Sequence, residues 1–378
     1  MRVMRPKKLL FLCLMALGVA LLAGCGGSSP VVHSVAGSFS NASLNGNFAF
    51  TLSGVNAGGP FAVAGRFQAN GAGVITAGAE DINSPGTVGV LINQPVTGTY
   101  AVRADGRGTA TLNSGSTTFN LAFVLINTST GLTIRFQSTG NASGTIDLQD
   151  ATAFNLTTLA GSFAFNVSGA DSLGHPEGLV GLITLDTSGD ITFGQVDQND
   201  NGTVTANNAV LAPTFLAFSV PTNGRSTLTV PTTSLGTLNF AVYIVDANHL
   251  KLVETDSGFP IVGEAFRQSS TTVSGSFAFT LAGASFTGNG AFVSGGILNT
   301  DGAGNILGTS VVDVDIGGAV VTNAPASGTF TVTGGRGTAT INGAAAQHFI
   351  FYPSTGGLQL LGTDITNVST GVAFSQTG

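Results

Sequence analysis

The residues of this sequence best suited to chemistry are acids and amides that recur in one spacing. In three places an aspartate is followed two positions later by an asparagine or aspartate, and three positions further on by a glycine. The copies are Asp81-x-Asn83-x-x-Gly86, Asp197-x-Asn199-x-x-Gly202 and Asp313-x-Asp315-x-x-Gly318. Carboxylate and amide oxygens at alternating positions are ligands that Ca²⁺ binds in proteins. The spacing therefore raises the hypothesis of a calcium site.

The middle copy carries the most potential ligands, at Asp197, Asn199 and Asn201. Its sequence resembles the first half of the loop of EF-hand calcium proteins. The twelfth position of such a loop holds a bidentate glutamate, whereas this chain has Asn208 there. We therefore expect an Asx turn that closes a hairpin, and calcium binding by these three residues is the alternative.

An arginine also recurs once in each copy, and the three are Arg107, Arg225 and Arg336. Because a guanidinium can bind a carboxylate or phosphate through two parallel hydrogen bonds, these residues could hold an acidic ligand. The simpler expectation is that each arginine covers one end of its unit or pairs with a nearby acid, such as the repeated aspartate.

Other catalytic and metal-binding patterns are missing from the sequence. The histidines occupy unrelated positions, which argues against a zinc site, and the Gly-x-Ser-x-Gly elbow of serine hydrolases does not occur. The histidines are His33, His175, His249 and His348, and the glutamates are Glu80, Glu177, Glu254 and Glu264. Paired carboxylates stay open as a hydrolase hypothesis, but we expect a non-enzymatic protein with no cofactor unless calcium binds.

These residues belong to a unit that the chain contains three times. Each unit begins with a Phe-Ala-Phe segment between glycines, and the copies lie about 115 residues apart. The copies are Gly46–Gly54, Gly161–Gly169 and Gly275–Gly283. Apolar and polar residues alternate in each copy, which is typical of a half-buried strand. The repeat predicts three tandem units, at 44–154, 155–270 and 271–378.

Eight short segments of the first unit alternate in this way. They are 48–52, 61–67, 74–82, 96–102, 109–112, 119–126, 132–137 and 144–149. Tight turns are expected at Asn70–Gly73 and Ala104–Arg107, and no segment after the leader has a helical period. We predict an all-β protein whose units are eight-stranded up-and-down barrels, because closure hides the strand edges. The pattern resembles the lipocalin and avidin families, and a β-sandwich is the alternative.

The barrel interiors bear on function, because eight strands enclose a space that side chains can fill or that can hold one small ligand. The 26 phenylalanines of the chain favour filled interiors. A transmembrane barrel is disfavoured, because the chain has no Trp and only three Tyr for the aromatic girdles of such barrels.

The N-terminal residues indicate export. Basic residues precede the apolar segment Leu9–Ala23, which has the length of a signal-peptide core. The basic residues are Arg2, Arg5, Lys7 and Lys8. The segment ends at Leu22-Ala-Gly-Cys25, which resembles the lipobox of bacterial lipoproteins. The resemblance implies removal of residues 1–24, acylation of Cys25, and attachment to the envelope by residues 25–43 as a flexible tether, with Gly26 directing the protein to the outer membrane.

Charge limits the partners. The full chain has a net charge of −7, and removal of the four leader cations leaves 8 basic against 19 acidic residues, a net charge of −11. Such a balance argues against nucleic acid. We expect a surface or periplasmic module for binding, adhesion or scaffolding, with a protein or glycan partner that the sequence does not identify. The alternative is a carrier of a small apolar ligand in the barrel interiors.

Overall fold

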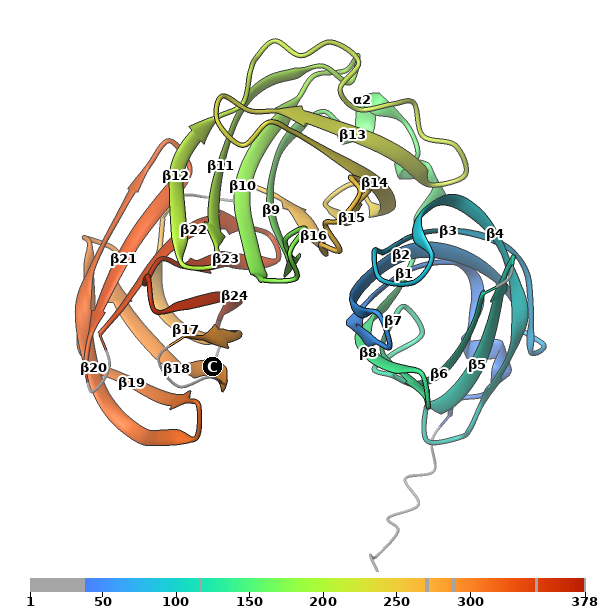
Figure 1. Ribbon diagram of the computed structural model, residues 1–378, viewed down its shortest axis with the longest axis horizontal. Coiled ribbons are helices and arrows are strands. Elements are labelled where there is room, and N and C mark those ends of the chain that lie inside the picture. Colours follow the sequence, from blue (N-terminus) through green and yellow to red (C-terminus); the bar gives the residue numbers. More distant parts are fainter. Residues whose placement is uncertain (1–37, 116, 269–271, 287–289, 344–345, 377–378) are drawn as a thin grey trace, which may run out of the picture. The chain divides into compact units, whose positions relative to one another are not determined.

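The first repeat folds into a closed antiparallel barrel in the computed structural model, which describes residues 38–115, 117–268, 272–286, 290–343 and 346–376. Its strands are β1 (Asn45–Asn56), β2 (Gly59–Asn70), β3 (Val74–Ser84), β4 (Gly89–Val102), β5 (Arg107–Ser114), β6 (Thr117–Leu125), β7 (Thr130–Gln137) and β8 (Gly140–Leu148). Each strand pairs with the next, and β8 pairs back onto β1. All eight expected strands are present, and Figure 1 shows them closing into a ring.

The third repeat forms a second closed barrel, in which β24 pairs with β17. Its strands are β17 (Ser274–Ser285), β18 (Gly290–Asp301), β19 (Asn305–Ile316), β20 (Ala319–Thr333), β21 (Arg336–Asn342), β22 (Gln347–Ser354), β23 (Gly357–Gly362) and β24 (Asn367–Ser375). The prediction of an all-β protein built from tandem barrel units is therefore confirmed.

The middle repeat departs from this plan, because its sheet does not close. Its strands are β9 (Gly161–Ala170), β10 (Pro176–Leu185), β11 (Ile191–Asp200), β12 (Thr203–Ala209), β13 (Arg225–Pro231), β14 (Thr237–Asp246), β15 (His249–Glu254) and β16 (Val262–Arg267). The ladder runs β12-β11-β10-β9-β16-β15-β14-β13, so β12 and β13 are its two edges. This repeat is a half-barrel rather than the closed barrel expected from its sequence.

The sheet opens at the segment between β12 and β13. β12 has 7 residues, whereas its counterparts β4 and β20 have 14 and 15. Residues 210–224 follow β12 and include Pro213 and Pro221, and proline cannot donate a hydrogen bond to a ladder. Four isolated bridges are the pairing described for this segment: Ile191 with Thr214, Val210 with Thr232, Phe218 with Leu228 and Thr222 with Arg225.

Each repeat has its own hydrophobic interior. Phe50, Phe165 and Phe279 occupy the same position in the three copies and are all buried. The cavity inside β17–β24 has a volume of about 30 Å³, which is room for about one water molecule. Inward-facing phenylalanines therefore fill this barrel, as the composition favoured.

Short helices lead into the first barrel and connect it to the middle repeat. They are η1 (Asn41–Ser43), η2 (Ala151–Ala153) and α2 (Leu156–Leu159). Among the residues that the structure describes, no helix has both the length and the apolar character needed to cross a membrane. The expected leader and Cys25 lie outside the described residues.

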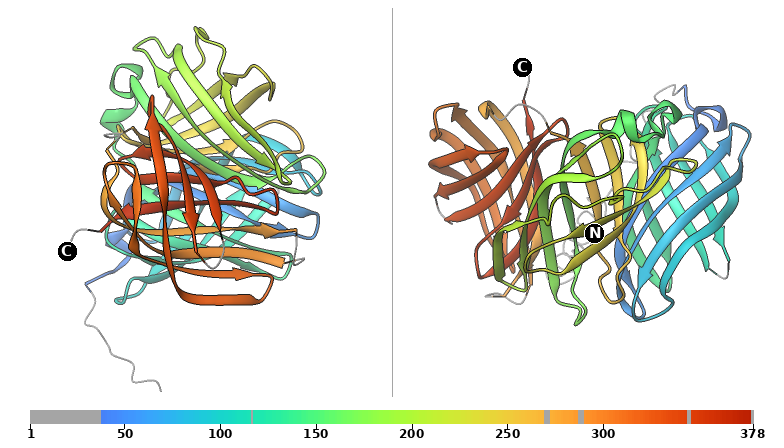
Figure 2. Two further views of the ribbon diagram at one scale, coloured as in Figure 1. Left: turned by 90° about the vertical axis from the view of Figure 1, so that its left-hand side faces the viewer. Right: turned by 90° about the horizontal axis from the view of Figure 1, so that it is seen from above.

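Residues 38–378 form one compact unit in which neighbouring repeats touch through the outer faces of their sheets. The first strands of one repeat contact the last strands of the next: β1 and β2 lie against β14 and β15, and β9 and β10 against β22 and β23. The right view of Figure 2 shows the middle repeat between the two closed barrels.

Candidate functional site

The repeated aspartate of the first repeat lies at the contact with the middle repeat. Asp81 is on β3, on the outer face of the sheet, and is 1% exposed. Arg225, from β13, donates from Nε to Oδ2 and from Nη2 to Oδ1, both at 2.7 Å. The hydroxyl of Tyr243, on β14, donates to Oδ2 at 2.5 Å, and the backbone N–H of Asn93 donates to Oδ1 at 2.8 Å. Four donors thus surround this buried carboxylate.

The same arrangement occurs once more, between the middle and third repeats. Asp197 accepts two hydrogen bonds of 2.8 Å from Arg336, one of 2.6 Å from the hydroxyl of Tyr352, and one of 2.5 Å from the backbone N–H of Asn207. The repeated arginine therefore does pair with the repeated aspartate, but with that of the preceding repeat. We call each set of aspartate, arginine and tyrosine a junction cluster.

Electrostatics keep the tyrosine of each junction cluster protonated. Burial raises the pKa of Tyr243 well above 10, and the negative charge of Asp81 acts in the same direction. The pKa of Tyr352 is raised for the same two reasons, with Asp197 as the neighbouring charge. Both tyrosines therefore stay protonated and donate to a carboxylate whose charge the arginine balances.

The repeated asparagines complete these junctions. Asn83 donates through Nδ2 to the carbonyl oxygens of Glu254, Asp256 and Phe259, at 2.8–3.0 Å. Asn199 donates in the same way to backbone carbonyls of the third repeat, those of Gly362 at 2.8 Å and Asn367 at 3.0 Å. Its Oδ1 accepts from the N–H of Gly202 at 3.0 Å, so the expected Asx turn is also present.

These contacts bear directly on the calcium hypothesis. Both oxygens of Asp197 accept from Arg336, and Asn199 uses its amide nitrogen for the third repeat and its oxygen for the turn. Asn201 lies on that turn with φ of 49°. A cation at this place would have to displace a guanidinium that already neutralises the carboxylate.

Apolar packing surrounds each junction cluster. At the first junction Ala49, Ala62 and Ala64 lie against Tyr243 and Val253. At the second junction a similar group forms from both repeats, comprising Ala164, Val180, Leu182, Ile350, Tyr352 and Leu361. The small alanines of β1 and β2 let the two sheets approach closely enough for the aspartate to reach the arginine.

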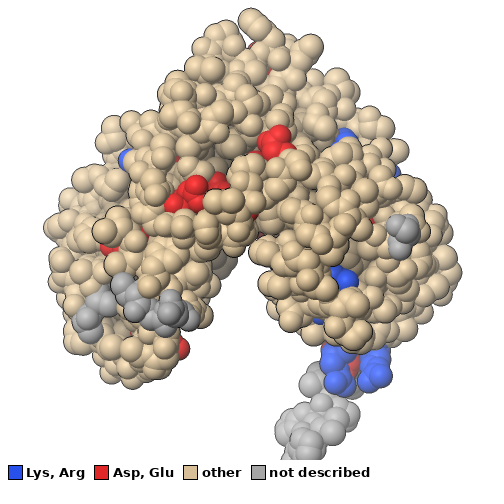
Figure 3. Space-filling model, in the orientation of Figure 1, with Lys and Arg blue, Asp and Glu red and all other residues tan. Residues whose placement is uncertain are grey.

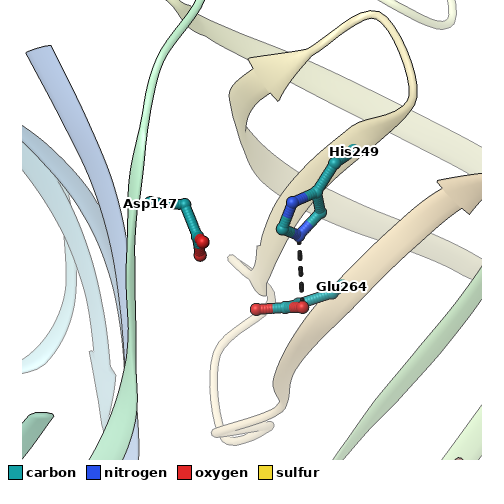
Figure 4. Close-up of side chains that lie close together, drawn as sticks. All are labelled: Asp147, His249 and Glu264. Atoms are coloured by element: carbon teal, nitrogen blue, oxygen red, sulfur yellow. Dashed lines mark hydrogen bonds and ion pairs between the residues drawn. The ribbon is translucent and has the colours of Figure 1, made fainter. Parts of the chain in front are cut away.

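One group of side chains at the first junction has the composition of a metal site. Asp147 of β8, His249 of β15 and Glu264 of β16 have potential ligand atoms within 4.8 Å of one another. Figure 4 shows Asp147 pointing across the junction at the other two. Lys251, which is 0% exposed, places its Nζ 2.8 Å from Asp147 and 2.6 Å from Glu264.

The lysine ammonium therefore holds the place that a cation would take in this group. Burial opposes ionisation of Glu264, but the charges of Lys251 and His249 hold its pKa well below the usual range. Burial likewise opposes the charge on Lys251, and the carboxylates of Glu264 and Asp147 nevertheless raise its pKa. The group is a buried ion-pair network that links the first two repeats.

Two glutamates in the interior of the middle repeat have altered acidity. Burial raises the pKa of Glu177 to about 7 and that of Glu254 to about 9, and the negative charge of Glu177 adds to the second shift. Shifted carboxyl pairs are a feature of hydrolase sites. Glu177 and Glu254 are only 4% and 3% exposed, however, so they lie inside the fold rather than in a cleft open to substrate.

A hollow of about 440 Å³ lies beside the first junction cluster, between β2–β4 and the segment that opens the half-barrel. Arg66 and Arg225 both line it, together with Ser219, Thr222 and Asn223. The Nε atom of Arg66 is buried and has no hydrogen-bond partner among the described residues. Burial lowers the pKa of Arg66, as expected for a guanidinium without a counter-ion.

Charge is sparse outside these groups, and most of the face in Figure 3 carries no Lys, Arg, Asp or Glu. The described histidines each pair with one acid of their own repeat: His175 with Asp171, His249 with Glu264 and His348 with Asp364. This fits their unrelated positions in the sequence.

Sequence reasoning missed Tyr243, Tyr352, Lys251 and Arg66. A signal existed for the tyrosines, because two of the three in the chain fall at corresponding positions of β14 and β22. Nothing in the pattern distinguishes Lys251 or Arg66 from solvent-exposed cations, since neither recurs at the corresponding positions of other repeats.

Comparisons with known proteins do not assign a family. No protein-family model matches the chain, and no curated protein matches it in sequence. The chain is similar to the crystal structure of CghA with Sch210972, at 8% identity over 87% of each chain with a TM-score of 0.20. It is similar to the crystal structure of CghA at 9% identity over 88% of this chain and 90% of that one, also with a TM-score of 0.20. At these TM-scores the likeness carries no argument about fold or function.

Proposed function

We propose that this chain is an exported lipoprotein of the bacterial envelope, held in the outer membrane by an acylated Cys25, and that it acts as a non-enzymatic scaffold. The observation that carries the scaffold role is the use of the recurring polar residues. Asp81 and Asp197, with their arginines and tyrosines, join one repeat to the next. Residues that recur for a ligand would keep their polar atoms free for it, whereas the carboxylates of Asp81 and Asp197 are occupied by donors of the neighbouring repeat.

The lipid anchor is tested by the substitution Cys25→Ser, which removes the thiol that the acyl chains would modify. We expect the wild-type protein in the outer-membrane fraction, with acyl mass on its N-terminal peptide, and the variant in the soluble fraction. Ser28→Ala, three residues further along the tether, serves as a control that keeps the thiol. A variant that still sediments with membranes, beside a wild-type peptide without acyl mass, would remove the anchor from the proposal.

The rival carrier function is disfavoured by the packed interior of the third barrel, since small-ligand sites are usually cavities of several hundred Å³, against about 30 Å³ here. We expect no saturable binding of a fluorescent fatty acid to the purified protein. Phe330→Ala, which enlarges that interior, is the matched comparison. Tight binding by the wild type, in competition with unlabelled fatty acid, would favour the carrier.

A second candidate function is the binding of a carboxylate group, and Arg66, whose Nε has no partner in the 440 Å³ hollow, favours it. Hydroxyl and amide side chains line the same hollow, which suits an acidic sugar. We expect glucuronate to bind weakly, to compete with acetate, and to lose its affinity in Arg66→Ala. Arg103→Ala, which removes an exposed arginine elsewhere on the barrel, should leave the affinity unchanged. Equal affinity in both variants would reject the site.

A further inference from the structure

The two junctions inside the chain are formed in the same direction along the sequence. In each, the outer face of the first three strands of one repeat meets the outer face of the last four strands of the next. Because the two faces are unlike, the described residues leave one of each kind uncovered, one on the first repeat and one on the third. We call β5–β8 of the first repeat the leading face, and β17–β19 of the third repeat, with Phe374 of the adjoining β24, the trailing face.

Ladder register shows which residues of the leading face correspond to the covered ones. In the middle repeat Arg225 pairs with Tyr243, which pairs with Lys251. In the first repeat Arg107 pairs with Val124, which pairs with Leu132. Arg107 therefore stands where Arg225 stands, and its neighbours on the face are apolar.

The leading face is an apolar surface that the described chain leaves uncovered. Its large side chains are 39–60% exposed, and they are Val124, Ile126, Leu132, Ile134 and Phe136. The corresponding positions of the middle repeat include Tyr243 and Val253. Both are fully buried, because the first repeat covers them. Terminal units of a repeat protein normally have polar outer faces, so this face has the character of an interface rather than of an end.

The trailing face carries the other half of such a junction. Asp313 stands at the position of Asp81 and Asp197 and is exposed. It lines a hollow of about 360 Å³ with Asp315, Val293, Val320 and Val321. The arginine of the leading face has a similarly exposed setting, since Arg107 is paired with Asp105 of its own turn.

The two uncovered faces also differ from the first junction in matching ways. At the first junction Lys251 pairs with Asp147 at 2.8 Å. Leu132 is the counterpart of Lys251 on the leading face, because it pairs with Val124 as Lys251 pairs with Tyr243. Phe374 is the counterpart of Asp147 on the trailing face, because it pairs with Ala278 as Asp147 pairs with Ala49. An ion pair is thus replaced by two apolar side chains, one on each face.

A second matching change concerns the repeated asparagine. Asn83 donates to carbonyls in the seven-residue segment between β15 and β16. The leading face has only a two-residue turn between β7 and β8, and so offers no such carbonyls. On the trailing face Asp315 replaces the asparagine. Where one face lacks the acceptors, the other therefore lacks the donor.

From these observations we propose that two copies of the chain associate head to tail, with the leading face of one on the trailing face of the other and Arg107 paired with Asp313. The partner is a second copy because charge, apolar character and strand order all match an interface that the chain already makes twice. A contact between unlike faces can repeat, so the product is a row of copies. This inference deepens the proposed scaffold role and rests on it.

Sedimentation velocity of the mature chain tests the proposal, with Cys25→Ser present so that no anchor affects solubility. We expect the average mass to rise with protein concentration. Arg107→Asp and Asp313→Arg should each abolish the rise, and mixing the two variants should restore association, because intact and charge-reversed pairs then form. Arg103→Asp makes the same charge change at another exposed site and should have no effect. Val124→Tyr, which supplies the tyrosine of the internal junctions, should strengthen association.

Three results would overturn the inference. The first is a monomer at every concentration, and the second is an association that both charge reversals leave unchanged. The third is a monomer that binds phosphatidylcholine vesicles and loses this binding in Phe136→Ser, since the leading face would then belong to lipid. None of these results bears on the fractionation of Cys25→Ser, so the envelope scaffold and its self-association are tested separately.

Discussion

Removal of the arginine from the first junction cluster should cost a large part of the stability of that junction. Arg225→Ala leaves Asp81 buried, at 1% exposure, with two of its four donors, Tyr243 and the N–H of Asn93. Breaking a buried ion pair by removing one partner costs about 3–5 kcal/mol. Since two donors remain, we expect a loss of about 3 kcal/mol in the free energy of unfolding.

Urea denaturation followed by far-ultraviolet circular dichroism measures this loss. Arg107→Ala is the matched control, because it removes the corresponding arginine of the first repeat, whose pair with Asp105 is exposed to solvent. At a protein concentration at which the chain is monomeric, the control should unfold at the same urea concentration as the wild type. A double-mutant cycle with Asp81→Asn isolates the pair, and we expect a coupling energy of about 2 kcal/mol.

The reasoning fails if Arg225→Ala changes the free energy of unfolding no more than Arg107→Ala does. The contact between Asp81 and Arg225 would then contribute nothing beyond an exposed ion pair. A coupling energy near zero in the cycle would lead to the same conclusion, even if each single substitution were destabilising.

Three further predictions follow from other buried groups. Burial raises the pKa of Glu80 to about 7 from its ordinary 4.5, so the folded state binds this proton more tightly and stability falls as the pH rises from about 4.5 through 7. Thermal melts should therefore give Glu80→Gln the same stability as the wild type at pH 4, and a free energy of unfolding roughly 3 kcal/mol larger than that of the wild type at pH 8. Equal melting temperatures of the two proteins at pH 8 would contradict this. Because Arg336 occupies both oxygens of Asp197, EDTA and added Ca²⁺ should leave the melting temperature unchanged, and a rise with Ca²⁺ that vanishes in Asp197→Ala would show a calcium site. Phe50→Ala, Phe165→Ala and Phe279→Ala should each cost about 3–5 kcal/mol, chiefly in their own repeat, since each ring belongs to a separate interior cluster; calorimetry would contradict this if all three variants moved a single transition alike.

The strands of the closed barrels could be predicted because alternation is imposed on each strand by one buried face. Their ends could not, since polar residues at the barrel rims, such as Asn56 and Asn70, still pair in the ladder. The opening of the middle repeat was also missed, although Pro213 and Pro221 were visible in the sequence. A strong repeat invites the assumption that all copies close alike, although this copy carries two prolines in the segment where β4 and β20 carry one each.

The acids and arginines of the candidate site were predicted, but their arrangement was not. Asp81, Asp197, Arg225 and Arg336 all recur, and the expectation that acid and arginine pair was sound. A repeat spacing does not distinguish a partner in the same copy from one in the next. The pairing of each aspartate with the arginine of the following repeat could therefore not be predicted. The burial of Lys251 could not be predicted for another reason. A neighbouring repeat buries this lysine fully, and the sequence around it gives no sign of that contact.

The middle repeat carries both halves of a junction, with Asp197 and Asn199 on one face and Arg225 and Tyr243 on the other. A tandem duplication of residues 155–270 would therefore place Asp197 of one copy opposite Arg225 of the next without any change in the terminal repeats. Such a duplication would lengthen the molecule by one whole repeat and keep the pair of arginine and aspartate at the added junction. Loss of the middle repeat would likewise bring Asp81 opposite Arg336, so the number of repeats can change while every junction keeps its acid, arginine and tyrosine.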